Sequence, residues 1–202
     1  MLRPVFLFAS ISASLLFILA SVTDASALGM SVQGAVISLT GSIKPQDDPD
    51  FRAFFKPLKG TVQSVDLSST GGSIAAAVAI GRIIRENGLT TVVDASRSLC
   101  GSACTILFLS GRKRLYLNAT GVADGTRAFG GRGLGFHDGN DKLSLEKTHY
   151  SGAASAAVIS AYYEFGVPAA ADLVTKADPK HFYYLSAGSA LHLGIATSTA
   201  KP

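Results

Sequence analysis

The chain has 202 residues, with 18 Lys and Arg against 14 Asp and Glu, which gives a formal net charge of +4. Only 16% of the residues are charged and 48% are hydrophobic, a balance that excludes a solvated disordered chain. Two cysteines cannot build a disulfide framework, and the small excess of positive charge gives no reason to expect nucleic-acid binding. We therefore expect an apolar leader followed by a single globular domain at residues 28–202.

The first 27 residues have the pattern of an export signal. Arg3 precedes an apolar stretch at residues 5–20, and residues 25–27 (ASA) form an A-x-A cleavage pattern. We expect cleavage after Ala27, a mature N-terminus at Leu28 and a periplasmic location. The alternative is an uncleaved membrane anchor facing the periplasm, because a tilted span or a thinned bilayer tolerates a short apolar core.

After the leader, apolar residues alternate between strand-like and helix-like spacing. Strands are predicted at residues 35–39, 62–67, 90–93 and 115–117, and helices at residues 51–55, 74–87, 102–109, 143–165, 169–176 and 187–193. Residues 44–50 are expected to be a loop and residues 68–73 a turn. Residues 118–135 form a long glycine-rich stretch without periodicity, which favours a functional loop. Strands that alternate with helices predict an α/β fold with a mainly parallel sheet flanked by helices.

Two glycine-containing corners stand at predicted strand-to-helix junctions. The first is SSTGGS at residues 68–73, where adjacent glycines allow a ligand to approach the backbone. The second is CGSAC at residues 100–104, where Ser102 begins a helix whose free N–H groups favour a developing negative charge. A serine at this position is often a simple N-cap. Neither corner has the Gly-Lys-Ser/Thr sequence of a phosphate-binding loop.

The chain has four histidines. His137 follows the glycine-rich stretch, and His181 lies in a predicted turn shortly after Asp178. His149 and His192 fall within predicted helices and are expected to be surface or packing residues. No H-x₃-H or C-x₂-C spacing occurs, so we expect no metal site.

Four segments resemble, in the same chain order, segments of the Clp protease proteolytic subunits (ClpP). They are VDLSSTGGSI at 65–74, CGSAC with the apolar helix and basic residues that follow it, GFHD at 135–138, and residues 178–195 with their aromatic-Leu-Ser turn. The resemblance covers roughly residues 35–197. It implies a ClpP/crotonase-like ββα spiral and, given the leader, an exported branch of these serine peptidases.

The resemblance also implies a catalytic triad. Ser102 matches the nucleophile, His137 the general base and Asp178 the acid that orients the histidine. The segment between Ser102 and His137 is longer than in cytosolic ClpP. The segment from His137 to Asp178, which in the family includes the helix that joins rings, is shorter. Asp138 and Asp141 are rival candidates for the acid.

The first corner is implied to complete the site. The N–H groups of Gly72 and Ala103 match the oxyanion hole, and Gly71, Gly72 and Ser73 match the substrate-binding segment. This chain departs from the family at Thr70, which stands where ClpP has a proline before the glycines.

Cys100 and Cys104 bracket Ser102 and would enter an oxidising compartment on export. Residues four apart on a regular helix hold their Cβ atoms about 5–6 Å apart, and a disulfide requires about 3.5–4.5 Å. We therefore favour two buried thiols over a disulfide, which remains possible because Cys100 precedes the helix.

These features predict a serine hydrolase, most simply a peptidase for short or unfolded peptides, without a cofactor and without an ATPase partner. The alanine-rich helix predicted at residues 143–165 and the resemblance together imply a homo-oligomer. Three alternatives stay open: a catalytically silent scaffold with the same fold, the acyl-CoA chemistry of crotonases, and a Ser–Lys dyad with Lys142.

Overall fold

The computed structural model describes residues 27–142 and 148–200; the predicted signal at residues 1–26 lies outside this part. The strands are β1 (Gly29–Gln33), β2 (Val36–Ile43), β3 (Ser64–Gly72), β4 (Thr90–Asp94), β5 (Leu99–Gly101), β6 (Arg114–Leu117), β7 (Gly125–Ala128), β8 (Gly133–Phe136), β9 (Asn140–Lys142), β10 (Thr148–Tyr150) and β11 (His181–Leu185). The helices are α1 (Asp47–Phe55), η1 (Lys56–Leu58), α2 (Ile74–Glu86), α3 (Ala103–Ser110), α4 (Gly152–Glu164), η2 (Pro168–Ala170), α5 (Ala171–Val174) and α6 (Ala187–His192).

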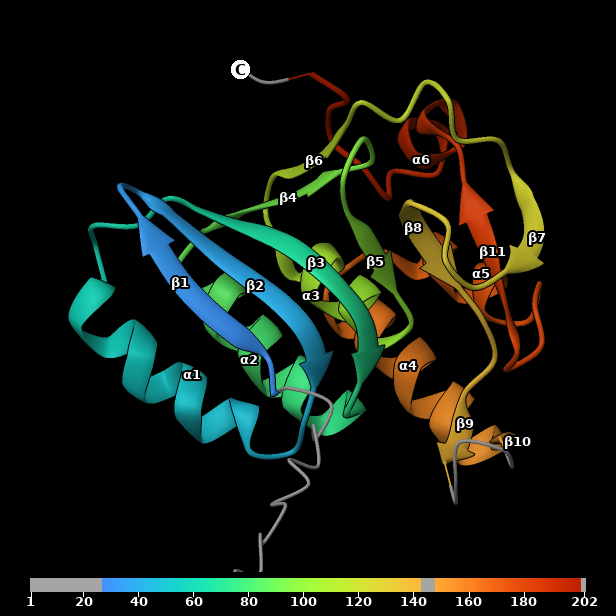
Figure 1. Cartoon of the computed structure of the whole chain (residues 1–202), viewed down its shortest axis with the longest axis horizontal. Coiled ribbons are helices and arrows are strands. Elements are labelled where there is room, and N and C mark those ends of the chain that lie inside the picture. Colours follow the sequence, from blue (N-terminus) through green and yellow to red (C-terminus); the bar gives the residue numbers. More distant parts are fainter. Residues whose placement is uncertain (1–26, 143–147, 201–202) are drawn as a thin grey trace, which may run out of the picture.

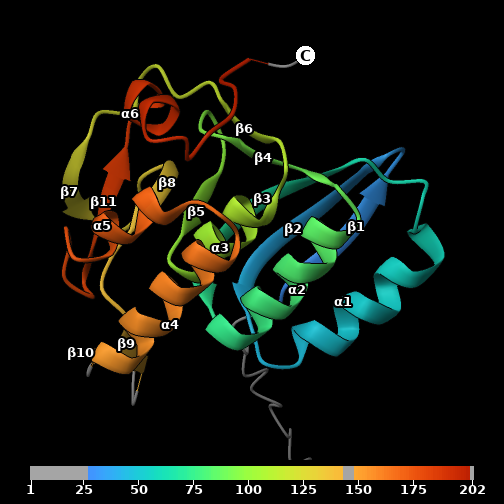
Figure 2. The same cartoon turned by 180° about the vertical axis from the view of Figure 1, so that it is seen from behind.

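A nine-stranded sheet runs through the molecule in the order β1-β2-β3-β5-β8-β11-β7, with β4 paired to β3 and β6 paired to β4. The pairs from β2 to β8 are parallel, as are those of β4. The edge strand β1 is antiparallel to β2, and the edge strand β7 is antiparallel to β11. β11 is also antiparallel to β8. Seen from behind, α1, α2, α3 and α4 lie in front of the sheet (Figure 2), and from the opposite side β1, β2 and β3 lie in front of the helices (Figure 1). The predicted α/β fold with a mainly parallel, helix-flanked sheet is confirmed.

The central helices follow the apolar pattern of the sequence. The Ser73 hydroxyl caps α2 by accepting from the N–H of Ala76, and Gly88 follows the helix with a φ of 66°. Every residue of α3 is buried, so this short helix lies inside the core, in contact with both α2 and β3. At the C-terminal end, the Ser186 hydroxyl caps α6 by accepting from the N–H of Ser189.

Four expectations for the chain path were wrong. α1 begins at Asp47 inside the predicted loop, because the aspartates at 47, 48 and 50 favour a helix N-terminus. The Asp47 carboxylate also accepts hydrogen bonds from the N–H groups of Lys44 and Leu28, which attach the helix start to the preceding chain. The predicted turn at residues 68–73 is the end of β3, which stays paired with β2 up to Gly72. The stretch at residues 118–135 contains β7 and most of β8.

The fourth correction concerns the helix predicted at residues 143–165. Residues 143–147 lie outside the described part, and α4 begins only at Gly152, capped by the Ser151 hydroxyl. His149 therefore lies in β10, which pairs with β9. Within the described residues, no helix is long and apolar enough to cross a membrane.

Tyr116 on β6 joins both halves of the sheet. Its buried hydroxyl donates to the carbonyl oxygen of Leu185 on β11 (2.9 Å) and accepts from the N–H of Leu134 on β8 (3.2 Å). Burial raises the pKa of Tyr116 to about 12. The phenol therefore stays protonated in the folded protein at pH values where an unfolded tyrosine ionises.

Stability should consequently depend on pH through Tyr116. Because the pKa is higher in the folded state, the contribution is complete below about pH 10 and is lost as the pH rises through 12. Urea unfolding from pH 8 to 12 should show this loss, up to about 3 kcal/mol. Tyr116→Phe should unfold more easily at pH 8, by about 1–3 kcal/mol, because the Leu134 N–H loses its acceptor. Its pH dependence should be flatter; parallel curves for the two proteins would contradict this assignment.

Candidate active site

Ser102 occupies the sharp turn between β5 and α3. Its φ of 54° and ψ of −129° lie outside the backbone angles that residues other than glycine normally adopt. Such a conformation costs about 1–3 kcal/mol and persists only where the surroundings enforce it. Its N–H donates to the carbonyl oxygen of Gly135 on β8 (3.0 Å), and its carbonyl oxygen accepts from the N–H of Thr105 (2.9 Å).

The turn also separates Ser102 from an ordinary helix cap. N-cap serines have extended backbone angles and use the side-chain oxygen to accept from the first helical turn, as Ser73, Ser151 and Ser186 do. Ser102 has a positive φ, and its hydroxyl makes no capping hydrogen bond to α3. The hydroxyl of the half-buried Ser102 therefore does not cap the start of α3.

The two glycine-containing corners meet at this turn. A Cβ atom on Gly71 would lie 2.6 Å from the Ser102 Cβ, 2.8 Å from the Gly101 carbonyl oxygen and 2.9 Å from the Ala103 nitrogen. Gly71 also has a φ of 97°. Only glycine fits here, for reasons of both space and backbone angle.

The other residues predicted for this region lie beside that contact. Gly72 pairs with Ile43 of β2 and has a φ of 140°. The Ser73 hydroxyl is the cap of α2, a structural role. Ala103 is the first residue of α3, where N–H groups have no partner within the helix.

His137 follows the strand that pairs with the strand leading to Ser102. β5 and β8 are parallel with Gly101 opposite Gly135, and His137 directly follows β8. The imidazole is buried and packs against two aromatic rings, Phe182 at 5.0 Å and Phe129 at 6.1 Å between centroids. Sheet register therefore brings the predicted base to the strand beside the predicted nucleophile.

The carboxylate of Asp178 is directed elsewhere. The Ala177 carbonyl oxygen accepts from the Asp138 N–H, so the two segments are adjacent. The Asp178 Oδ1, however, lies 2.9 Å from the Nδ1 of His181 and accepts from the Lys180 N–H at 2.7 Å. The hydrogen bond with His181, followed by that from Lys180, lowers the pKa of the exposed Asp178.

Of the rival acids Asp138 and Asp141 and the alternative base Lys142, the structure describes the side chain of Asp138. Asp138 is half-buried, and its carboxylate accepts a hydrogen bond from the Ser155 hydroxyl of α4 (3.3 Å). The side chains of Asp141 and Lys142 lie outside the described part of the chain. His192 is exposed at the end of α6. In residues 27–142 and 148–200, no group of three His, Cys, Asp or Glu side chains could hold a metal ion.

Sequence reasoning missed two supports of the site. The Thr105 hydroxyl donates to the Ser102 carbonyl oxygen (2.6 Å) and lies 2.5 Å from the hydroxyl of Tyr162 on α4. Phe182 packs so closely on Gly101 and Gly135 that a Cβ on either glycine would lie 2.5 or 2.9 Å from the ring. Gly101 and Gly135, which lie opposite each other on β5 and β8, were the sequence signal for this contact, because glycines on neighbouring strands leave room for a large ring.

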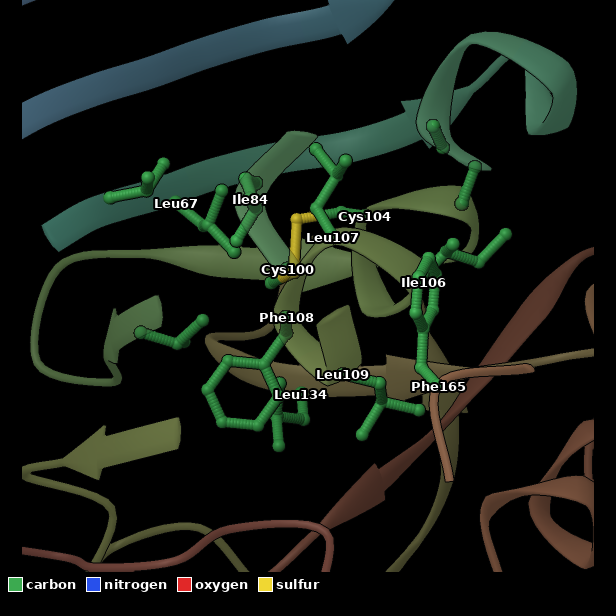
Figure 3. Packing of buried hydrophobic residues seen from close by; sticks show 14 of the residues in the cluster. Leu67, Ile84, Cys100, Cys104, Ile106, Leu107, Phe108, Leu109, Leu134 and Phe165 are labelled. Carbon is green, nitrogen blue, oxygen red and sulfur yellow. A yellow bond between two sulfur atoms is a disulfide. The ribbon is translucent and has the colours of Figure 1, made fainter. Parts of the chain in front are cut away.

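The cysteines correct another expectation. Cys100 and Cys104 form a disulfide, with Cα atoms 5.1 Å apart, where two thiols were favoured. The helical spacing assumed for them does not apply, because Cys100 lies in β5 and the turn at Ser102 reverses the chain before α3. Both cysteines are fully buried, among Leu67, Ile84 and other core side chains (Figure 3).

Gly71→Ala should disrupt this corner. The added methyl group meets the backbone of the Ser102 turn, and φ is unfavourable, so we expect a loss of about 1–3 kcal/mol in stability. Gly188→Ala is the matched control, because Gly188 lies within α6 with no atom within 4 Å of the added methyl; it should stabilise by about 0.5–1 kcal/mol. Urea unfolding of both variants measures this, and equal stabilities would contradict the contact.

Comparisons with known proteins bear on the fold. No family model and no curated protein sequence matches the chain. Among solved structures, a complex of the membrane-bound stomatin-specific protease 1510-N with a substrate peptide is similar with a TM-score of 0.60 and 15% identity, covering 82% of this chain and 74% of that one. Another 1510-N structure has a TM-score of 0.56 and 14% identity over 82% and 78%.

The ClpP protease catalytic domain from Plasmodium falciparum is similar with a TM-score of 0.54 and 16% identity, over 83% of this chain and 86% of that one. The chain has the fold of these proteases, as the resemblance of its sequence motifs to ClpP predicted.

Proposed function

We propose that the protein is an exported serine hydrolase that cleaves peptide bonds, with Ser102 as its nucleophile. The observation that carries the proposal is the positive-φ turn at Ser102, which presents a half-buried hydroxyl that does not cap the helix it precedes. A serine on a strained strand-to-helix turn is the arrangement that exposes the nucleophile in other hydrolase folds. The similar fold of several serine proteases supports the same reading.

The proposed chemistry assigns one role to each group at the turn. The His137 imidazole takes the proton of the Ser102 hydroxyl as the oxygen attacks the carbonyl carbon of the substrate. The negative charge that develops on the carbonyl oxygen is stabilised by the N–H of Ala103 at the start of α3, with the N–H of Gly72 as the second donor. The protonated imidazole then returns its proton to the leaving amine, and water releases the acyl group.

Two assignments of the groups that activate Ser102 remain open in this proposal: His137 oriented by Asp178, or a lysine base. Asp178 would orient His137 only after its carboxylate turns away from His181. A lysine base is the alternative: the two 1510-N structures are of variants that replace a serine and a lysine, 41 positions apart, by alanine. Ser102 and Lys142 are 40 positions apart here. Variants of both residues decide between the triad and a Ser–Lys dyad.

The proposed substrates are short or unfolded peptides outside the cytoplasm. Export would separate the protein from ATP-driven unfolding partners, so folded proteins would have to be opened before cleavage. One similar protease was captured with a substrate peptide, which supports a peptide as the occupant of this site. The resemblance to ClpP also supports association of several copies in the proposed working form.

Hydrolysis of fluorogenic peptides by the purified protein tests the proposal. Ser102→Ala and His137→Ala should each lower kcat/KM by at least about 10³-fold, and the double variant should be hardly worse than either. Asp178→Asn should lower the rate no more than Ser102→Ala, because the nucleophile remains. A collapse of activity in Lys142→Ala, with His137→Ala active, would replace the triad by the dyad.

His149→Ala is the matched control, because this exposed histidine lies in β10 and should leave the rate within about twofold of the wild type. Retention of full hydrolysis by Ser102→Ala would refute the assignment of the nucleophile. A folded wild-type protein that cleaves no peptide would favour the scaffold alternative.

A further inference from the structure

The disulfide spans the proposed nucleophile symmetrically. Cys100 lies two residues before Ser102 and Cys104 two residues after it, so the bond closes a small covalent loop with Ser102 at its centre. Four residues of extended chain would separate the two Cα atoms by about 13 Å, but they are 5.1 Å apart. The bond therefore fixes the reversal of the chain at Ser102.

The strand that leads into this turn is short. β5 has three residues and pairs with β3 at a single position, Ser69 opposite Cys100. On its other side, all three residues of β5 pair with β8, a strand of four residues. A covalent link from Cys100 to the buried helix α3 anchors β5 to the core through a bond that does not depend on sheet pairing.

The hydrogen bonds at Ser102 are made by the peptide groups on its two sides, and the φ and ψ angles of Ser102 lie between them. The Ser102 N–H is held by Gly135, and its carbonyl oxygen by the N–H and hydroxyl of Thr105. These contacts hold the peptide groups on either side, whereas φ and ψ of Ser102 determine where the hydroxyl points. The disulfide restrains the distance across both angles, because it joins Cys100, two residues before Ser102, to Cys104, two residues after it.

We propose that the Cys100–Cys104 disulfide is a positioning element for the nucleophile, which holds Ser102 at its positive φ and so sets the direction of its hydroxyl. This inference rests on the proposed function. Loss of the bond should relax Ser102 toward an ordinary backbone conformation and move its oxygen away from His137 and the Ala103 N–H. Misplacement of a reacting group by about 1 Å can lower a rate by about a hundredfold.

The test compares the Cys100→Ala/Cys104→Ala double variant with wild type. Alanine is chosen because both sulfur atoms are fully buried, and serine would bury hydroxyl groups there. The readouts are the rate of Ser102 labelling by a fluorophosphonate, kcat and KM for a peptide, and the thermal midpoint. We expect labelling and kcat to fall by about ten- to a hundredfold, with KM changed less than about threefold.

Ile37→Ala separates positioning from general loss of stability. Ile37 is fully buried at the start of β2, whereas the site lies at the other end, where Ile43 pairs with Gly72. This variant should lower the thermal midpoint and leave the labelling rate within about twofold of wild type. Wild-type labelling in the double alanine variant would overturn the proposal and leave the bond as a structural staple.

Reduction provides a second measurement that does not depend on folding of the double variant. Dithiothreitol becomes a cyclic disulfide as Cys100 and Cys104 become thiols, and the thiols are counted at each concentration. The labelling rate should fall in proportion to the thiols that appear; a constant rate would overturn the proposal. If wild type with an intact bond is not labelled at Ser102, the proposed function itself fails, which is a distinguishable result.

Discussion

The backbone conformation of Ser102 is the constraint on which the proposed site depends. A φ of 54° is unfavourable for serine, and the peptide groups of Ser102 make hydrogen bonds to β8 and within the first turn of α3, while the disulfide closes across the turn. The turn can be this tight only because Gly71 lacks a side chain, since a Cβ there would lie 2.6 Å from the Ser102 Cβ. In that conformation the hydroxyl leaves the helix cap, and the N–H of Ala103 remains at the open end of α3.

Parallel strands explain why distant segments meet at this turn. β3, β5 and β8 run in one direction, so Gly71 at the end of β3, Ser102 after β5 and His137 after β8 gather at one edge of the sheet. Ligands in open α/β sheets bind at the carboxyl ends of strands for the same reason. The similarity to known proteases gives the fold; the chemistry is inferred from the turn and its neighbours.

The periodic parts of the fold were predictable, and the glycine-rich parts were not. α2 and the Ser186 cap of α6 follow helical spacing and capping chemistry directly. β8 (GLGF) is buried on both faces, so its sequence has no alternation by which to recognise a strand. The motifs singled out the segments of Ser102 and His137, and the structure places the strands before them side by side. The direction of the Asp178 carboxylate could not be predicted, because it depends on a local hydrogen bond with His181. The disulfide was missed because a regular helix was assumed through Ser102.

The most direct test of this account is to locate the adduct of a fluorophosphonate probe by peptide-mapping mass spectrometry of the folded wild-type protein. The account predicts a single modified residue, Ser102, because in residues 27–142 and 148–200 this is the serine with a positive φ, at a helix start and next to the strand that leads to His137. No adduct in folded protein, or an adduct confined to another serine such as Ser69 or Ser73, would contradict it.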